Sequence, residues 1–284
     1  MGRRLGQHFL FDPAILDRIV DALDPSDTDV VIEIGPGIGT LTERLAARVR
    51  RVIAIEKDRE LVGRLREGYG NDGEGGKGKG EGWASLPANV SVVEGDALEL
   101  DWHGLIAEAT VPPSPSPVPG SYKIIGNIPY AITSPLIEKA LTPPLPGVVV
   151  FLVQREVADR VAAEPGSKVY GGLSVGVQTV AGAERLFTVR AGAFKPPPRV
   201  DSAVVRFTPM PDPLVAPRDH AEFRRFVTAL FGRRRKQLRG AIRGVTGRER
   251  ADVEAELVRL GIEPTVRCET LPPADFVRLF DAFA

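Results

Sequence analysis

Asn127-Ile128-Pro129-Tyr130 brings together groups that can hold an exocyclic amine. The Asn127 side-chain oxygen and the Ile128 backbone carbonyl can accept two hydrogen bonds from one amino group. Tyr130 can lie flat on the ring that carries this amine. Such a site suits chemistry on the amino nitrogen of a flipped or unpaired base. The same four residues also suit a simple turn at a strand end, so the motif alone leaves both interpretations open.

A glycine-rich turn and two carboxylates lie upstream, each at the end of an apolar run. The turn Gly35-Pro36-Gly37-Ile38-Gly39 precedes a helix, and its glycines allow the backbone to approach a ligand closely. Glu56 and Asp96 end the next two runs, where they could accept hydrogen bonds from ribose hydroxyls and from an adenine amine. Each feature also has a simpler explanation: the glycines could serve only a tight turn, Glu56 could be a solvated strand end, and Asp96 could cap a helix. Together they favour a nucleoside site.

The elements that position these residues alternate between strands and helices. Apolar runs predict strands at 30–34, 52–56, 90–94, 121–126 and 147–153, and amphipathic segments predict helices that include 132–141 and 155–163. This alternation predicts an α/β fold with a parallel sheet covered by helices on both faces. Two later apolar segments, 186–189 and 203–207, could form a closing, hairpin-like pair.

A proline-rich linker near residue 210 divides the chain into an expected α/β domain, 1–209, and a helical domain, 210–284. The formal net charge of the chain is +0, yet residues 218–250 hold 11 Lys or Arg against 3 Asp or Glu, a local net charge of +8. This asymmetry indicates a nucleic-acid-facing region. A basic helical face that is merely solvated stays open as the alternative.

Cysteine and histidine are too scarce for some classes of site. Cys268 is the one cysteine and the three histidines are far apart, so the sequence predicts no intrachain disulfide and no metal site. The apolar run 148–153 is too short to cross a bilayer and no signal core opens the chain, so we expect a cytoplasmic protein without a membrane partner. Glycine-rich 68–82 and proline-rich 111–119 are expected to be surface insertions, the first flexible and the second extended.

More motifs follow in order and give a specific resemblance. They are Gly6-Gln7-His8-Phe9-Leu10, Glu33-Ile34-Gly35-Pro36-Gly37 with Glu56, Gly95-Asp96-Ala97, Asn127-Ile128-Pro129-Tyr130, Gln154-Arg155-Glu156-Val157-Ala158, Tyr170-Gly171-Gly172-Leu173-Ser174-Val175 and Phe194-Lys195-Pro196-Pro197-Pro198-Arg199-Val200-Asp201-Ser202. From about Gly6 to about Leu279 the chain resembles the rRNA adenine dimethyltransferases. The basic stretch 233–239 and the last helix resemble the KsgA/RsmA-type branch most.

This resemblance implies a Rossmann-like class I methyltransferase sheet and a small C-terminal all-helical domain. It implies S-adenosylmethionine as cofactor, S-adenosylhomocysteine as product and no metal. The implied reaction transfers methyl groups to N6 of two adjacent adenosines near the 3′ end of small-subunit (16S) rRNA. The substrate would be a pre-ribosomal particle, and the protein is expected to be a monomer that acts in ribosome biogenesis.

The resemblance also implies roles for particular residues. The expected catalytic residues are Asn127, Ile128, Pro129, Tyr130 and Phe194, with Tyr130 and Phe194 on the two faces of the extruded adenine. The expected cofactor-binding residues are Gln7, His8, Leu10, Gly35, Gly37, Glu56, Asp96, Ala97 and Asn127. The expected RNA-binding residues are Arg233, Arg234, Arg235, Lys236 and Arg239. His8 stands where the bacterial pattern usually has Asn, so an altered contact is expected at the cofactor's methionine end.

Rival interpretations remain at this point. The chain could be an RNA-binding small-subunit assembly factor with little turnover, although Gly35, Glu56, Asp96 and Asn127 favour activity. It could be a methyltransferase of large-subunit rRNA, which shares the catalytic core but matches the C-terminal region less well. No transit segment supports a mitochondrial transcription-associated relative. The order of the motifs argues against a DNA adenine methyltransferase.

Overall fold

The computed structural model of the 284-residue chain describes residues 8–67, 86–109 and 120–284. Gln7 and the two expected insertions, 68–82 and 111–119, lie outside the described residues. Contacts divide the chain into two compact units. The first comprises 1–140, 144–155 and 185–208, and the second comprises 141–143, 156–184 and 209–284.

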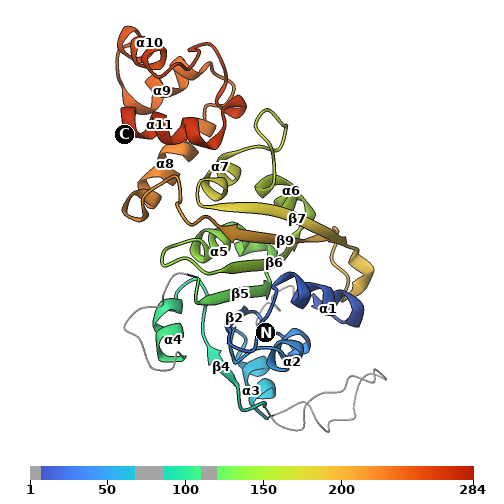
Figure 1. Cartoon of the computed structure of the whole chain (residues 1–284). Helices are drawn as coiled ribbons and strands as arrows, with labels where there is room; N and C mark the ends of the chain where they lie inside the picture. The colour runs from blue at the N-terminus through green and yellow to red at the C-terminus, as the bar shows by residue number, and fades with distance from the viewer. Residues whose placement is uncertain (1–7, 68–85, 110–119) are drawn as a thin grey trace. The chain divides into compact units, whose positions relative to one another are not determined.

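Seven strands form one mixed sheet in the order β4-β3-β2-β5-β6-β9-β7 (Figure 1). They are β2 (Val30–Ile34), β3 (Arg51–Glu56), β4 (Val90–Glu94), β5 (Tyr122–Asn127), β6 (Val148–Gln154), β7 (Ala181–Val189) and β9 (Ser202–Pro209). The first five pair in parallel, and β9 runs antiparallel to β6. The five predicted strands and the neighbouring pair near 186–207 are confirmed.

The register of the parallel strands brings their carboxyl ends into line. Ile34 of β2 lies opposite Ile55 of β3 on one side and Gly126 of β5 on the other. Glu56 lies opposite Glu94, the last residue of β4. The residues that follow these four strands therefore gather at one edge, which is where open α/β sheets bind ligands.

Helices join the parallel strands. In the first unit they are α1 (Pro13–Ala22), α2 (Thr40–Ala46), α3 (Arg59–Glu67), α4 (Trp102–Ala109) and α5 (Thr133–Ala140). Buried residues of α1 and α2 share one core cluster with inward-facing residues of β2, β3, β5 and β6. Right-handed crossovers are the rule between parallel strands. With this strand order they place α2 and α3 on one face of the sheet and α4 and α5 on the other, as in Figure 1.

The start of α1 shows how local sequence sets these elements. The Asp12 carboxylate accepts hydrogen bonds from the amides of Ala14 and Ile15, at 3.0 and 3.2 Å, and Pro13 occupies the first helical position. Leu16, Ile19 and Val20 then form the buried face.

A second, two-stranded sheet joins segments that are far apart in sequence. Strand β1 (Phe9–Leu10) pairs antiparallel with β8 (Phe194–Lys195), and the pairs are Phe9 with Lys195 and Leu10 with Phe194. Strands of two residues carry no readable periodicity, and the sequence did not predict this pair. The pairing holds the N-terminal segment beside the loop that follows Phe194.

The second unit is mostly helical. Its helices are α6 (Arg155–Val161), α7 (Gly172–Gln178), α8 (His220–Phe231), α9 (Leu238–Thr246), α10 (Arg250–Arg259) and α11 (Pro273–Phe283). Arg155, the first residue of α6, still belongs to the first unit. Apolar residues of α7 to α11 share one buried cluster, and the Tyr170 hydroxyl donates to the Leu271 carbonyl at 3.0 Å. The division by contacts groups residues 156–184 with these helices. The predicted domain boundary at 209/210 stays a prediction, since it concerns where an independently folding domain begins.

Candidate active site

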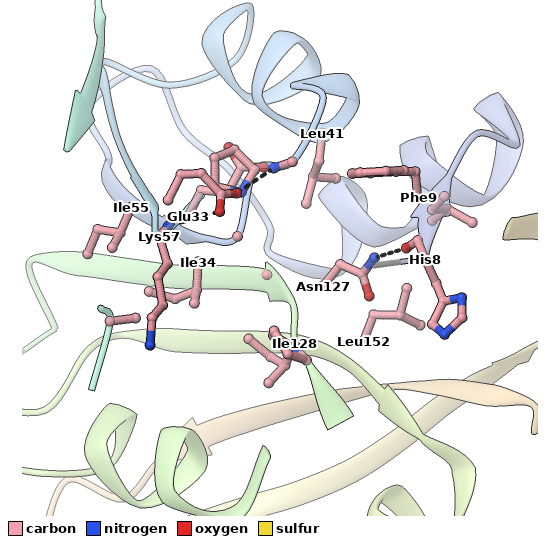
Figure 2. A pocket seen from close by; sticks show the side chains of 18 of the residues that line it. His8, Phe9, Glu33, Ile34, Leu41, Ile55, Lys57, Asn127, Ile128 and Leu152 are labelled. Atoms are coloured by element: carbon pink, nitrogen blue, oxygen red, sulfur yellow. Dashed lines mark hydrogen bonds between the residues drawn. The ribbon is translucent and has the colours of Figure 1, made fainter. Parts of the chain in front are cut away.

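A pocket of about 440 Å³ lies at the carboxyl edge of β2, β3, β4 and β5 (Figure 2). Its size is within the range of small-molecule and cofactor sites. It brings together these residues expected from sequence: His8, Leu10, Gly35, Gly37, Glu56, Asp96, Ala97, Asn127, Ile128, Pro129 and Tyr130. In Figure 2, Glu33 and Lys57 lie toward one end of the pocket and His8 toward the other.

The glycine-rich turn forms one wall of the pocket. Its path needs the left-handed backbone region at Gly37, where φ is +59°. A Cβ atom at Gly37 would lie 3.0 Å from the Phe9 ring, so a side chain there would also push the N-terminal segment away. The amide of Gly35 donates to the Ile55 carbonyl at 2.9 Å, which fixes the entry of the turn against β3.

Glu56 is buried and holds the turn together. Its Oε2 accepts a hydrogen bond from the Gly37 amide at 3.1 Å, and its Oε1 accepts from the amides of Lys57 and Asp58, both at 2.9 Å. Burial raises the pKa of Glu56, and these three amide bonds oppose the rise. A carboxylate has about four acceptor positions, so one remains for a ligand hydroxyl. Glu56 therefore shapes the turn as well as offering a contact to a ribose.

Asp96 lies at the end of β4 and is tied to two groups. Its Oδ1 accepts from the Leu98 amide at 2.9 Å, and its Oδ2 lies 2.6 Å from Lys57 Nζ. The hydrogen bond from Lys57 and that from the Leu98 amide lower the pKa of Asp96. An ionised Asp96 is a strong acceptor for an amino group, although one of its oxygens is already paired with the Lys57 ammonium. Sequence reasoning did not assign Lys57 to the site.

Glu33 is a second residue of the pocket wall that sequence reasoning left without a role. It lies in β2, is 1% exposed, and its Oε2 has no hydrogen-bond partner within the described structure. Burial raises the pKa of Glu33 to about 8; neighbouring Glu56 adds to the rise, and Thr42 opposes it. A buried, unsatisfied acceptor costs free energy unless a ligand compensates it. An acidic residue inside an otherwise apolar strand was the signal that could have identified it.

Asn127 ends β5 and is held by the N-terminal segment. Its Nδ2 donates to the backbone carbonyl of His8 at 3.0 Å, as Figure 2 shows. This bond uses the amide nitrogen and leaves Oδ1 as the acceptor for a ligand. Ile128 is buried, and its amide donates to the Leu152 carbonyl at 3.0 Å, which fixes the backbone after Asn127.

Tyr130 is half-buried and anchored at its far end. Its hydroxyl lies 2.8 Å from Ser202 Oγ, and burial raises its pKa. Thr133 is buried, and its hydroxyl bridges the carbonyls of Pro129 and Tyr130 at 3.3 and 3.2 Å. The turn after β5 is therefore held rigidly, and it can support one face of a bound aromatic base.

Related sequences match this chain along nearly its whole length. The family model described as ribosomal RNA adenine dimethylase matches residues 2–284. The chain belongs to the ribosomal RNA adenine dimethylase family. A relative from Geobacillus thermodenitrificans, named ribosomal RNA small subunit methyltransferase A, is 41% identical over 99% of this chain and 90% of that protein. One of the same name from Janthinobacterium is 36% identical over 98% and 96%.

Solved structures agree with this dimethylase assignment. A dimethyladenosine transferase from Plasmodium falciparum superposes with a TM-score of 0.74, at 26% identity and 97% coverage of both chains. A 23S rRNA methyltransferase, ErmE, has a TM-score of 0.68 at 27% identity, with 97% of this chain and 99% of that chain covered. The expected methyltransferase fold with a C-terminal helical region is confirmed.

The dimethylase family depends on S-adenosylmethionine, and the residues present fit this cofactor. The pocket offers a glycine turn for close backbone approach, acceptors at Glu56 and Asp96, and the buried, unpartnered Oε2 of Glu33. A cationic ligand suits a wall that carries the carboxyl groups of Glu56 and Asp96, while burial holds Glu33 largely in its neutral form. Among the described residues, no group of three or more His, Cys, Asp or Glu could hold a metal ion. No helix in this part of the chain could span a membrane.

Phe194, which was expected beside the adenine, is buried in the folded chain. Its side chain is 2% exposed and belongs to the core cluster that also contains Leu10 and Leu16. It is not among the described residues that line the pocket. The expected stacking of Phe194 and Tyr130 on the two faces of the adenine stays a prediction. The pairing of Phe194 with Leu10 across β1 and β8 explains why an aromatic residue is buried there.

The expected RNA-binding residues lie in the second unit, and they differ from one another. Residues 233–236 lie exposed in the turn between α8 and α9, and within the described chain these four cations form no ion pair. Cations at the start of a helix oppose its dipole, so α9 gains no stability from them. Arg239, by contrast, is part of a salt bridge with Glu254 at 2.8 Å. It is therefore less available to a phosphate.

Proposed function

We propose that this dimethylase-family enzyme methylates N6 of adenosines in small-subunit rRNA, with Asn127-Ile128-Pro129-Tyr130 as the adenine site. The observation that carries this proposal is the hydrogen bond from Asn127 Nδ2 to the His8 carbonyl, which leaves the amide oxygen as the acceptor. Relatives that span nearly all of this chain carry the name ribosomal RNA small subunit methyltransferase A, which supports the choice of RNA.

The proposed chemistry begins with the lone pair of the amine. The nitrogen of an aromatic amine is a weak nucleophile because its lone pair is delocalised into the ring. Hydrogen bonds from this amine to Asn127 Oδ1 and to the Ile128 carbonyl draw the nitrogen toward a tetrahedral form and localise the lone pair. The two oxygens also stabilise the positive charge that develops on the nitrogen during transfer.

The protein's remaining task is orientation. S-adenosylmethionine supplies an activated methyl group when it is bound. The glycine turn with Glu56, together with Asp96, would hold the nucleoside part, while Tyr130 supports the target base on the other side of Asn127. Fixing two partners in line converts a bimolecular step into an effectively unimolecular one and accounts for a large share of the barrier reduction.

The finer features of the substrate belong to the same proposal. We expect two adjacent adenosines near the 3′ end of small-subunit rRNA to be converted to N6,N6-dimethyladenosine within a pre-ribosomal particle in the cytoplasm, by a monomer. The exposed cations at 233–236 would contact rRNA phosphates. Relatives named for small-subunit rRNA support this choice of substrate. The alternative to exclude is that the enzyme methylates large-subunit rRNA.

Mass spectrometry of rRNA nucleosides tests the proposal. Purified protein and S-adenosylmethionine are incubated with small ribosomal subunits that lack adenosine dimethylation, and separately with large subunits. N6,N6-dimethyladenosine should appear in the small-subunit rRNA, and mapping of fragments should place it at two adjacent positions. Modification of large-subunit rRNA alone, or binding without any methylation, would reject the proposed function.

A further inference from the structure

Lys139, on α5, contacts the turn that carries Asp96. We propose that Lys139 is a positioning residue of the cofactor site: its ammonium holds the turn 96–101 so that the Asp96 carboxylate stays directed at the adenine amine of the cofactor. This inference rests on the adenine contact that the proposed function gives to Asp96. Lys139 itself is not among the described residues that line the pocket.

The chain makes one tight turn directly after β4, and Asp96 lies at its start. The Asp96 backbone carbonyl accepts hydrogen bonds from the amides of Glu99 and Leu100, at 2.9 and 3.0 Å. Its side-chain Oδ1 accepts from the Leu98 amide at 2.9 Å. The carboxylate that is expected to receive the adenine amine is therefore also the cap of this turn. Its direction depends on whether the turn keeps its shape.

Lys139 closes the other end of the same turn. Its Nζ donates to the backbone carbonyls of Leu98 and Leu100, at 2.8 and 2.6 Å. The last carbonyls of a helical turn have no partner within the turn, and a cation there satisfies them and suits their partial negative charge. One ammonium, 39 and 41 residues away in sequence, thus fixes two carbonyls of the turn.

The ammonium is itself held in place. Nζ of Lys139 lies 5.0 Å from the ring centroid of the buried Trp102, within the range of a cation–π contact. Burial lowers the pKa of Lys139, and the carboxylates of Asp101 and Asp96 oppose this change. A hydrogen bond away from water is stronger than one in water, so these carbonyl contacts hold the turn more firmly than an exposed lysine would.

The two lysines near Asp96 therefore have different tasks. Lys57 pairs with the carboxylate directly, and its side chain is 61% exposed. Lys139 acts on Asp96 through the backbone of the turn, and its charge helps to lower the pKa of Asp96. Loss of Lys139 leaves two carbonyls without their donor and releases the turn, so the expected defect is a loss of selectivity for the adenine amine.

A ligand without this amine separates positioning from general stability. S-Inosylhomocysteine is S-adenosylhomocysteine with an oxygen in place of the exocyclic amine, so it cannot donate to Asp96. Wild-type protein should bind S-adenosylhomocysteine more tightly by about tenfold or more, as for a hydrogen bond to a charged acceptor. In Lys139→Met, which keeps an apolar stem beside Trp102, this preference should fall to about threefold or less. Calorimetry on the full chain measures both Kd values.

Three further variants serve as controls. Lys139→Gln keeps an amide donor but has no charge and a shorter reach, so its preference should lie between those of wild type and Lys139→Met. Lys168→Met removes an exposed ammonium in the second unit and should keep the wild-type preference. In an Asp96→Ala background, Lys139→Met should weaken S-adenosylhomocysteine binding by less than about a further twofold, because both changes remove the same contact.

An unchanged preference in Lys139→Met and Lys139→Gln would overturn the assignment. So would an equal loss of affinity for both ligands, which is what a merely structural role produces. Circular dichroism shows whether each variant is folded, and if Lys139→Met is not, Lys139→Gln makes the same comparison. Wild-type protein without a preference would remove Asp96 from the adenine contact and the inference with it. These measurements use no rRNA, so a failure of wild-type protein to methylate rRNA, which would reject the proposed function, is a separate result.

Discussion

Lys57 Nζ lies 2.6 Å from Asp96 Oδ2, across the end of the pocket where an adenine amine is expected. The Lys57 side chain is 61% exposed and that of Asp96 is 18% exposed. An exposed ammonium holds a half-buried carboxylate, so the pair can open at little cost to folding, because solvent-exposed ion pairs contribute little to stability. Lys57 covers this end of the pocket, and Asp96 offers the specific acceptor.

Substitution of each partner should therefore have unequal effects on cofactor binding. Lys57→Met keeps an unbranched apolar stem and should change the Kd of S-adenosylhomocysteine by less than about fivefold. Asp96→Ala removes a charged acceptor and should weaken binding by about tenfold or more. Calorimetry at one fixed salt concentration measures both. If Lys57→Met lost as much affinity as Asp96→Ala, the ammonium would itself be a ligand contact.

Glu33 should make stability depend on pH. Burial raises its pKa to about 8 in the folded protein, against an ordinary value of 4.5. Between these values the folded state holds a proton that the unfolded state has lost, so the free energy of unfolding falls as pH rises. Above the folded pKa this contribution is lost, because a charged carboxylate must then be buried.

Glu33→Gln is the matched variant, since Gln cannot ionise. The difference in Tm, wild type minus variant, should decline between pH 5 and pH 8.5, over the window set by these two pKa values. Thermal unfolding at half-unit pH steps measures this slope, and the subtraction removes the titration of all other groups. A difference that stayed constant across the window would mean that Glu33 is ionised in the folded protein.

The cations of the second unit should fall into two functional groups. Arg234→Gln and Arg235→Gln remove exposed charges without ion pairs within the described chain. Each should reduce the slope of log K against log salt by about 0.7–0.9 if it contacts a phosphate. Fluorescence anisotropy with a labelled fragment from the 3′ end of small-subunit rRNA measures this slope.

Arg239→Gln is the control for this series. Arg239 pairs with Glu254, with side chains 27% and 33% exposed. Its loss should leave the salt slope unchanged and lower the free energy of unfolding only slightly, because exposed ion pairs contribute little to stability. A full unit of salt slope lost in Arg239→Gln, with no change in Arg234→Gln or Arg235→Gln, would place the RNA contact on α9 rather than in the turn before it.

Much of the fold could be predicted from the sequence, because apolar runs of five to seven residues mark buried parallel strands. The polar residues directly after them had to meet at one edge, which is why Gly35, Glu56, Asp96 and Asn127 were found together. The pairing of β1 with β8 could not be predicted, because strands of two residues carry no hydrophobic pattern and depend on contacts between segments that are distant in sequence.

The residues whose place in the structure could not be predicted share a physical cause, since sequence does not give the direction of a side chain. Phe194 before a proline run looks the same whether its ring packs inward or faces a base. Lys57 reads as a solvated residue after a strand until its Nζ is seen on Asp96. Glu33 reads as part of a strand, and its burial against α2 and Glu56 is a tertiary effect.

Asn127→Ala tests the central claim most directly. Small subunits that lack adenosine dimethylation are incubated with wild-type or variant protein, and N6,N6-dimethyladenosine is quantified by mass spectrometry beside calorimetry of S-adenosylhomocysteine. Loss of a transition-state acceptor should lower the rate by about 100-fold or more. The Kd should change by less than about fivefold, the scale of a single neutral hydrogen bond. Near-normal methylation by Asn127→Ala would contradict the account.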